Sequence, residues 1–189
     1  MTIVSDSKYL QFKYTKSPSG HDWYYVRRTN DTNIHDSAVA ITTLVKINGE
    51  YNFLFLKTKR PPLYAENKAN FCLESPAGLI GDKDCNESLI QCIKKELLEE
   101  TGLVANKIFI EQYNSCTSAG LSSETLSFVT VIVDDYHLES TPISDGGIII
   151  DRFFVKASQI REFLTTLDSK EYSVACATTA GIFYALNRI

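Results

Sequence analysis

Apolar residues along the chain fall into short runs whose spacing is typical of β-strands. Two aromatic runs, 9–14 and 22–28, flank a segment with Ser, Pro and Gly, and together they predict an antiparallel hairpin. The runs 37–47 and 51–59 are rich in β-branched and aromatic residues, and the Asn-Gly dipeptide between them favours a tight hairpin turn. The chain before residue 60 is therefore predicted to contain two hairpins.

Further strands alternate with helices after residue 60. Apolar runs predict strands at 71–75, 107–115, 124–133 and 148–155, with a turn at 76–78. Helices are predicted at 88–101, 158–167 and 172–189. Because strands predominate and helices are interspersed, the pattern indicates an α/β fold, a sandwich with a mixed sheet.

The helix predicted at 88–101 has recognisable ends and one apolar face. Asn86 is a candidate N-cap, and Gly102 stands where a left-handed residue would end the helix. At about 100° per residue, one apolar stripe is formed by Leu89, Ile90, Ile93 and Leu97.

Two glutamates share this apolar face. Glu100 falls within about 35° of the centre of the stripe, and Glu96 lies at its edge, one turn earlier. Two negative charges at this spacing repel each other and are costly to desolvate without a positive partner. A hard divalent cation such as Mg²⁺ would meet that need, because it prefers carboxylate oxygens. The alternative is an ordinary solvated face, which Glu99 alone would fit.

Composition and charge restrict the class of protein. The chain has 189 residues, 44% of them hydrophobic, which suits one domain with a small appendage. The net charge of −4 offers no basic surplus for nucleic acid, and five cysteines without paired spacing predict neither a disulfide framework nor a zinc site. Since no leader-like segment or bilayer-spanning apolar run is recognisable, we expect a soluble cytoplasmic protein that binds no membrane.

Between residues 81 and 103, Gly81 is followed after five residues by Glu87, and after seven more by KELLEETGL at 95–103. This spacing closely resembles the Nudix box. The segment departs from the family pattern at Lys95, where the pattern has arginine.

The surroundings of the box narrow the resemblance to one branch of the family. The ESPAGL run at 74–79, Arg60 before two prolines and the aromatic N-terminal extension are similar to the ADP-sugar (ADP-ribose) pyrophosphatases. The resemblance implies a Nudix-type α/β/α sandwich at 36–189 and an N-terminal antiparallel β extension at 1–35 for dimerisation and adenine binding. It further implies a homodimer that hydrolyses ADP-ribose or a related ADP-sugar to AMP and a sugar phosphate.

A metal site is also implied by the resemblance. Glu96, Glu99 and Glu100, with the backbone carbonyl of Ala77, would coordinate Mg²⁺, with Mn²⁺ as the other possible ion. Such ions would neutralise the diphosphate and activate a water molecule for attack on phosphorus. Lys95 would orient a box glutamate, and Glu99 lies within its reach at i, i+4.

Substrate contacts are implied for Tyr9, Trp23, Arg28, Arg60, Glu74 and Gly120. The arginines would hold phosphate through parallel hydrogen bonds, Glu74 would contact the terminal ribose, and Gly120 belongs to the loop at the far end of the substrate. The aromatic pair would stack on the adenine across a dimer interface. In the ordinary structural alternative, the charged residues are solvated strand ends and the aromatic pair belongs to the core of the N-terminal hairpin.

Two further positions depart from the branch. Ala119 replaces a usual proline, and Ile148 stands roughly where relatives place a glutamate that acts as general base or metal ligand. Asp145 or Asp151 would then substitute for that glutamate. These departures leave two alternatives open: a degenerate Nudix domain that binds an adenine nucleotide without hydrolysis, and a Nudix hydrolase of another nucleoside diphosphate derivative.

Overall fold

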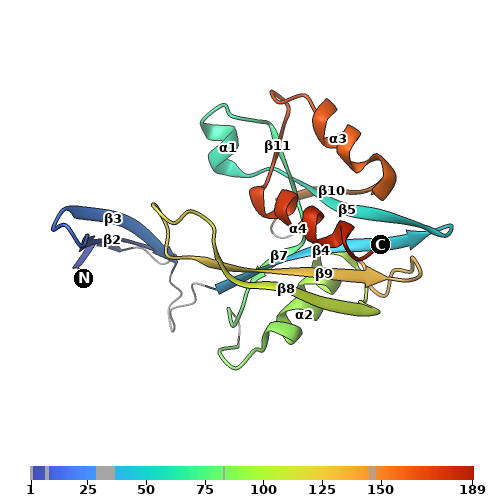
Figure 1. Cartoon of the computed structure of the whole chain (residues 1–189), viewed down its shortest axis with the longest axis horizontal. Coiled ribbons are helices and arrows are strands. Elements are labelled where there is room, and N and C mark those ends of the chain that lie inside the picture. The colour runs from blue at the N-terminus through green and yellow to red at the C-terminus, as the bar shows by residue number, and fades with distance from the viewer. Residues whose placement is uncertain (1, 7–8, 29–36, 83, 145, 147) are drawn as a thin grey trace.

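Helices lie on both faces of a central mixed sheet, and a smaller sheet extends from one end (Figure 1). The computed structural model describes residues 2–6, 9–28, 37–82, 84–144, 146 and 148–189. The strands are β1 (Thr2–Asp6), β2 (Leu10–Lys16), β3 (Asp22–Arg28), β4 (Ser37–Ile47), β5 (Glu50–Thr58), β6 (Phe71–Glu74), β7 (Ala77–Leu79), β8 (Lys107–Cys116), β9 (Thr125–Val133), β10 (Ile149–Lys156) and β11 (Tyr172–Val174). The helices are α1 (Pro61–Ala65), α2 (Leu89–Thr101), the 3₁₀ turn η1 (Ala157–Gln159), α3 (Ile160–Thr166) and α4 (Cys176–Leu186). Across the described residues, none of these helices combines the length and apolar character needed to cross a membrane.

The central sheet has the strand order β11-β6-β5-β4-β9-β8, with β10 paired to β5 and β7 paired to β4. The pairs β4–β9 and β6–β11 are parallel. The remaining pairs of this sheet are antiparallel. The mixed sheet predicted from the sequence is therefore confirmed.

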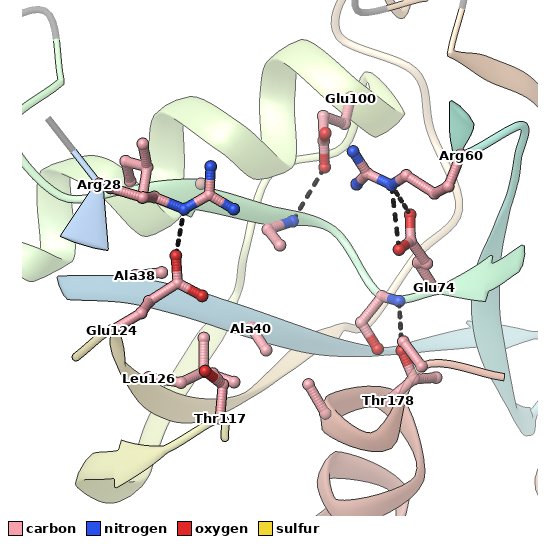
Figure 2. A pocket seen from close by; sticks show the side chains of 16 residues that line it. Arg28, Ala38, Ala40, Arg60, Glu74, Glu100, Thr117, Glu124, Leu126 and Thr178 are labelled. Atoms are coloured by element: carbon pink, nitrogen blue, oxygen red, sulfur yellow. Dashed lines mark hydrogen bonds and ion pairs between the residues drawn. The ribbon is translucent and has the colours of Figure 1, made fainter. Parts of the chain in front are cut away.

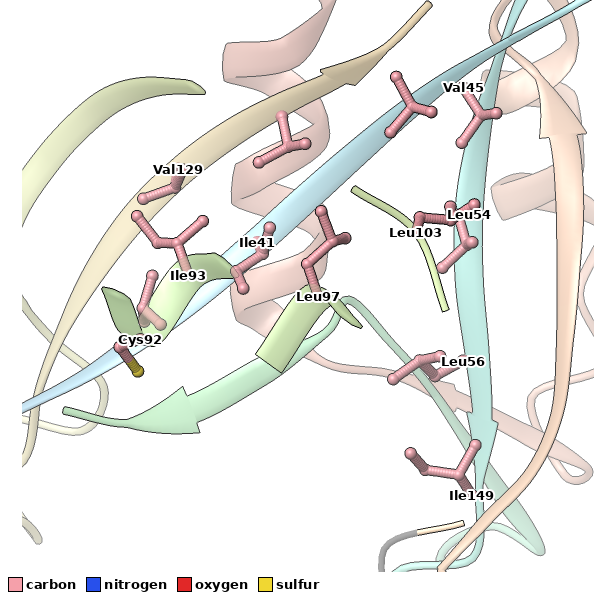
Figure 3. Close-up of a cluster of buried hydrophobic side chains, with 13 residues drawn as sticks. Ile41, Val45, Leu54, Leu56, Cys92, Ile93, Leu97, Leu103, Val129 and Ile149 are labelled. Atoms are coloured by element: carbon pink, nitrogen blue, oxygen red, sulfur yellow. The ribbon is translucent and has the colours of Figure 1, made fainter. Parts of the chain in front are cut away.

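Strand β4 is buried on both faces because its side chains alternate between two helical layers. Val39 and Ile41 belong to the same apolar cluster as Ile93 of α2 (Figure 3). Leu44 joins a second cluster, which contains Ile182 of α4. Burial on both faces explains why this strand reads as a continuous apolar run. The α/β/α sandwich is confirmed by these two layers.

The N-terminal extension forms a separate antiparallel sheet, β1-β2-β3, so the predicted hairpin has one additional strand. This sheet is attached to the loop between β8 and β9. The N–H of Val26 donates to the carbonyl of Leu121 at 2.7 Å, and the N–H of Ser123 donates to the carbonyl of Val26 at 3.2 Å. The extension and this loop therefore form one continuous structure.

Several local predictions differ from the structure, and in two of them pairing with a distant strand overrides the local signal. The expected turn at 76–78 contributes instead to β7, whose backbone pairs with β4. The closing helix expected at 172–189 begins only at Cys176, because 172–174 pairs with β6 as β11. The segment 158–167 consists of η1 and α3 rather than one regular helix, and α1 was not predicted.

Candidate active site

Helix α2 positions the glutamates of the box. Its N-cap is Ser88 rather than the predicted Asn86, because the Ser88 side chain and Gln91 form a reciprocal capping box. The helix ends as predicted at Gly102, whose φ of 72° is left-handed. Ile90 is 38% exposed and does not belong to the buried face, whereas Glu100 is buried as its phase predicted.

Strand β7 packs closely against the glutamates of α2. The backbone N–H of Ala77 donates to Oε2 of Glu100 at 3.0 Å. The side chain of Glu96 lies against Gly78, where an added Cβ would be only 2.3 Å from its Cδ. Only glycine allows this approach without displacing the Glu96 carboxylate. Strand β7 thus brings Ala77 beside Glu100 and Gly78 beside Glu96, and the use of the Ala77 carbonyl as a metal ligand stays a prediction.

A cavity of about 230 Å³ lies beside this contact and is lined by Ala77, Gly78, Leu79, Asp82, Glu96, Glu99, Glu100 and Ile143. Its four carboxylates are the donor type that a hard divalent cation prefers. Among the described residues, however, no three His, Cys, Asp or Glu side chains are gathered closely enough to hold a metal ion. The chemistry of the donor set fits Mg²⁺, and the side chains would have to converge further to bind it.

Lys95 contacts different glutamates from the one predicted. Its Nζ donates to Oε1 of Glu87 at 2.7 Å and lies 3.2 Å from Oε1 of Glu96. Glu87 also accepts from the N–H of Gly81 at 3.0 Å, so the segment before the helix places its carboxylate beside Lys95. This tertiary partner replaces the local i, i+4 contact with Glu99.

Hydrogen bonds stabilise the charged forms of Glu87 and Lys95. Burial would raise the pKa of Glu87, but the hydrogen bonds from Lys95 and Gly81 outweigh it and hold that pKa below its usual value. Burial would lower the pKa of Lys95, but the bonds to Glu87 and Glu96 raise it overall. Lys95 therefore stays positive beside Glu96.

A second cavity, of about 300 Å³, contains two arginine–carboxylate pairs (Figure 2). Nε of Arg28 donates to Oε2 of Glu124. Nε of Arg60 lies 2.9 Å and 3.1 Å from the two carboxylate oxygens of Glu74, which also accepts from the hydroxyl of Thr58 at 2.9 Å. Three predicted substrate residues, Arg28, Arg60 and Glu74, therefore line one cavity.

The two cavities share a wall. Both are lined by Glu100 and by the three residues of β7. In Figure 2 the guanidinium group of Arg60 lies between the carboxylates of Glu74 and Glu100. The fold thus places a recess that contains two arginine–carboxylate pairs directly beside one that is lined by four carboxylates.

The remaining predicted substrate residues lie outside the lining of this cavity. Nε1 of Trp23 donates to the carbonyl of Gly120 at 3.1 Å, so these two residues are in contact with each other. Trp23 is 50% exposed and is not a core residue. Tyr9 is 64% exposed and is not among the residues that line either cavity.

Of the two aspartates predicted to substitute for the missing glutamate, the structure describes only Asp151. Asp145 lies outside the described residues. Asp151 is exposed on β10, and its Oδ1 accepts from the N–H of Arg152 at 2.7 Å.

Sequence reasoning missed several residues of the site. Glu124 pairs with Arg28, and Thr178 accepts a hydrogen bond from the N–H of Ser75 at 2.7 Å, which holds the link between β6 and β7. Glu124 is the first residue of the strand predicted at 124–133, but its pairing depends on a partner 96 positions away. No sequence pattern predicts the role of Thr178, because only the tertiary packing of α4 places it beside the β6–β7 link.

Known proteins with similar sequences include three named hydrolases or pyrophosphatases, although no protein-family model matches the chain. An uncharacterised Nudix hydrolase of Schizosaccharomyces pombe is 31% identical over 158 residues, which cover 80% of this chain and 71% of the relative. Nudix hydrolase 2 of Caenorhabditis elegans is 31% identical over 194 residues, covering 97% and 83%. The ADP-sugar pyrophosphatase of Mus musculus is 28% identical over 137 residues, covering 70% and 59%.

Solved structures show a related fold. An ADP compounds hydrolase matches with a TM-score of 0.64 and 16% identity, over 99% of this chain and 90% of the other. The NUDIX domain of Shewanella oneidensis NrtR, in complex with ADP ribose, matches with a TM-score of 0.57 and 19% identity, over 82% and 89%. Together with the two relatives at 31% identity and the box at 81–103, this fold shows that the chain belongs to the Nudix hydrolase family.

Proposed function

We propose that the protein is a Mg²⁺-dependent hydrolase that cleaves the diphosphate of ADP-ribose or a related ADP-sugar to AMP and a sugar phosphate. The observation that supports this most directly is the wall that the arginine cavity shares with the carboxylate cavity, formed by Glu100 and β7. A diphosphate bound to the arginines would lie beside the carboxylates. The name of the mouse relative and the ADP ribose bound by the NrtR domain favour this class of substrate.

In this proposal the arginine pairs orient the diphosphate. Each ion pair engages Nε, so that within the described part of the chain the terminal amino groups of Arg28 and Arg60 remain available for phosphate oxygens. Glu74 holds Arg60 and borders the place where the terminal ribose would lie. Because both arginines are already fixed by carboxylates, little side-chain entropy is lost when substrate binds.

The carboxylate cavity would hold the cation through Glu96, Glu99, Glu100 and the carbonyl of Ala77, with Mn²⁺ as the other possible ion. When bound, the cation supplies positive charge that offsets the diphosphate and polarises the phosphorus. The oxygen of water then bonds to one phosphorus, and the bridging oxygen leaves with the other phosphate. Asp145 would accept the proton of that water. Asp151 is the alternative acceptor.

Residues 1–35 would serve as a separate extension for dimerisation and adenine binding. Its described part exposes an unusual number of large apolar side chains for so small a sheet: Tyr9, Leu10, Phe12, Trp23 and Tyr24. We propose that a second copy of the chain covers them, and that Trp23, with Tyr9 as its possible counterpart, stacks on the adenine. Unpaired cysteines support a reducing compartment such as the cytosol.

A binding module without hydrolysis is the second candidate. One observation favours it: the described carboxylates are not gathered at metal-binding distances. Four carboxylates around one cavity weigh against it, because a module that only binds nucleotide has little use for so much negative charge.

The substrate panel is the decisive experiment for the proposed function. With Mg²⁺, we expect ADP-ribose to give AMP and ribose 5-phosphate, and chelation of the metal to stop the reaction. Other ADP-sugars, UDP-sugars and NADH are compared by product identification. Preference for a substrate without ADP would favour a Nudix hydrolase of another nucleoside diphosphate derivative. If no compound is turned over, the binding module is favoured.

Within that panel, Glu100→Gln should abolish hydrolysis while the midpoint of thermal unfolding stays equal or rises. The amide oxygen still accepts the N–H of Ala77, and the buried charge is removed. Retention of at least half the wild-type rate at saturating Mg²⁺ would refute the assignment of Glu100.

A substitution at Lys95 tests its role in holding Glu96. Lys95→Ala should lower kcat about tenfold and weaken Mg²⁺ binding, because the carboxylate loses a fixed cationic neighbour. Lys95→Arg should retain activity or raise it modestly, since a guanidinium group can bridge two carboxylates. The control is Lys94→Ala, at the exposed neighbouring position. Equal turnover in all variants would show that Lys95 has no orienting role.

The proposed stacking platform predicts a change in KM. Trp23→Ala should raise KM strongly and change kcat less, because stacking acts similarly on the ground and transition states. Loss of one stacked face should cost about 1–3 kcal/mol. Phe183→Ala removes an exposed aromatic side chain from α4 and should leave KM unchanged. An unchanged KM in Trp23→Ala would refute the stacking role and leave Trp23 with only its structural contact to Gly120.

Sedimentation tests the proposed assembly. The wild-type protein should be a dimer at micromolar concentration, and Phe12→Asp should shift it towards monomer because a charge would be buried in the interface. Phe183→Asp, at another exposed phenylalanine, should leave the dimer intact. A wild-type monomer with full activity would contradict the dimer.

A further inference from the structure

Arg152 reaches from the central sheet to the end of the box helix. Its backbone lies in β10, where it is paired with Leu56 of β5. Its Nε donates to the carbonyl of Glu100, and its Nη2 donates to the carbonyl of Ile143. One guanidinium group therefore links β10 both to the end of α2, 52 positions earlier, and to the loop that precedes β10.

The carbonyls at the end of α2 need such partners. The last backbone carbonyls of a helix receive no hydrogen bond from an N–H of the same helix. A cation near the C-terminus also interacts favourably with the helix dipole. The N–H of Ile143 donates to the carbonyl of Glu99 at 2.8 Å, and the N–H of Glu139 donates to the carbonyl of Gly102 at 2.8 Å. The loop after β9 and Arg152 thus satisfy the end of the helix together.

Ile143 is held on both sides of its backbone. Its N–H is bound to α2, and its carbonyl is bound to Arg152. The loop also approaches the helix end so closely that a Cβ at Gly102 would lie 2.4 Å from the carbonyl oxygen of Ser140. Because Ile143 lines the carboxylate cavity, the position of this wall relative to Glu99 and Glu100 depends on these contacts.

We propose that Arg152 is a positioning residue of the active site: its two-pronged contact fixes the Ile143 wall of the carboxylate cavity to the C-terminal end of α2. The consequence for catalysis rests on the proposed function. Arg152 contacts backbone carbonyls and is not among the residues that line either cavity, so it acts through the loop and the helix rather than on substrate. A guanidinium group is required because an ammonium cannot donate to both carbonyls in a fixed fork.

The test uses the full-length chain and the variants Arg152→Gln and Arg152→Lys. Arg161→Gln, at an exposed arginine of α3, is the matched control. Hydrogen–deuterium exchange is measured without metal or substrate, for the amides of 138–144 and, as an internal reference, of 39–45 in β4. Hydrolysis of ADP-ribose is then measured over a Mg²⁺ titration to separate kcat, KM and the Mg²⁺ requirement.

We expect Arg152→Gln to speed exchange in 138–144 about tenfold while β4 is unchanged, and to lower kcat at least about tenfold, with KM altered much less. The Mg²⁺ concentration for half-maximal rate should rise. Arg152→Lys should lie between the wild-type protein and Arg152→Gln, and Arg161→Gln should match the wild-type protein.

Unchanged exchange in 138–144, or an unchanged kcat, in Arg152→Gln would overturn the proposal. If Arg152→Lys matches the wild-type protein in both exchange and kcat, the two-pronged contact is refuted. If Arg152→Gln does not fold, the comparison between Arg152→Lys and the wild-type protein decides. Failure of the wild-type protein to hydrolyse any compound of the panel would refute the proposed function instead. In that case the exchange measurement alone determines whether Arg152 fixes the loop.

Discussion

The hydrogen bond from the Ala77 amide to the Glu100 carboxylate is the contact on which the site depends. It joins helix α2 to β7, the three-residue strand that pairs with β4. Because Glu100 is buried and negatively charged, the contact is favourable only where the strand presents an N–H, and the backbone pairing of β7 with β4 ensures that it does. Both cavities are built on the two sides of this junction.

Local signals predicted the elements, and distant partners determined the details. The spacing of glutamates, the apolar phase of α2 and the Asn-Gly turn depend on neighbours within a few residues, so they were visible in the sequence. The pairing of Lys95 with Glu87, the strand character of Ala77 and the reach of Arg152 depend on which segments the fold brings together. No periodicity records such contacts, and for that reason those predictions were wrong or missing.

Ion pairing stabilises the two arginines of the arginine cavity. Two cations facing one recess would repel each other and would be costly to desolvate, but Glu74 and Glu124 offset both charges. The same pairing limits the side-chain rotamers of Arg28 and Arg60. If the recess binds the proposed substrate, its fixed guanidinium groups would select the ligand by geometry more than by total charge.

The backbone pairing between β3 and the loop at 121–123 has a consequence for how sequences of this kind diverge. Trp23 contacts Gly120, and Arg28 contacts Glu124, so both ends of β3 are matched to one loop. A change in the length of that loop would shift the register of the whole extension. An insertion or deletion in the β8–β9 loop would therefore have to be matched by a compensating change in β3, even though the two segments are almost a hundred positions apart.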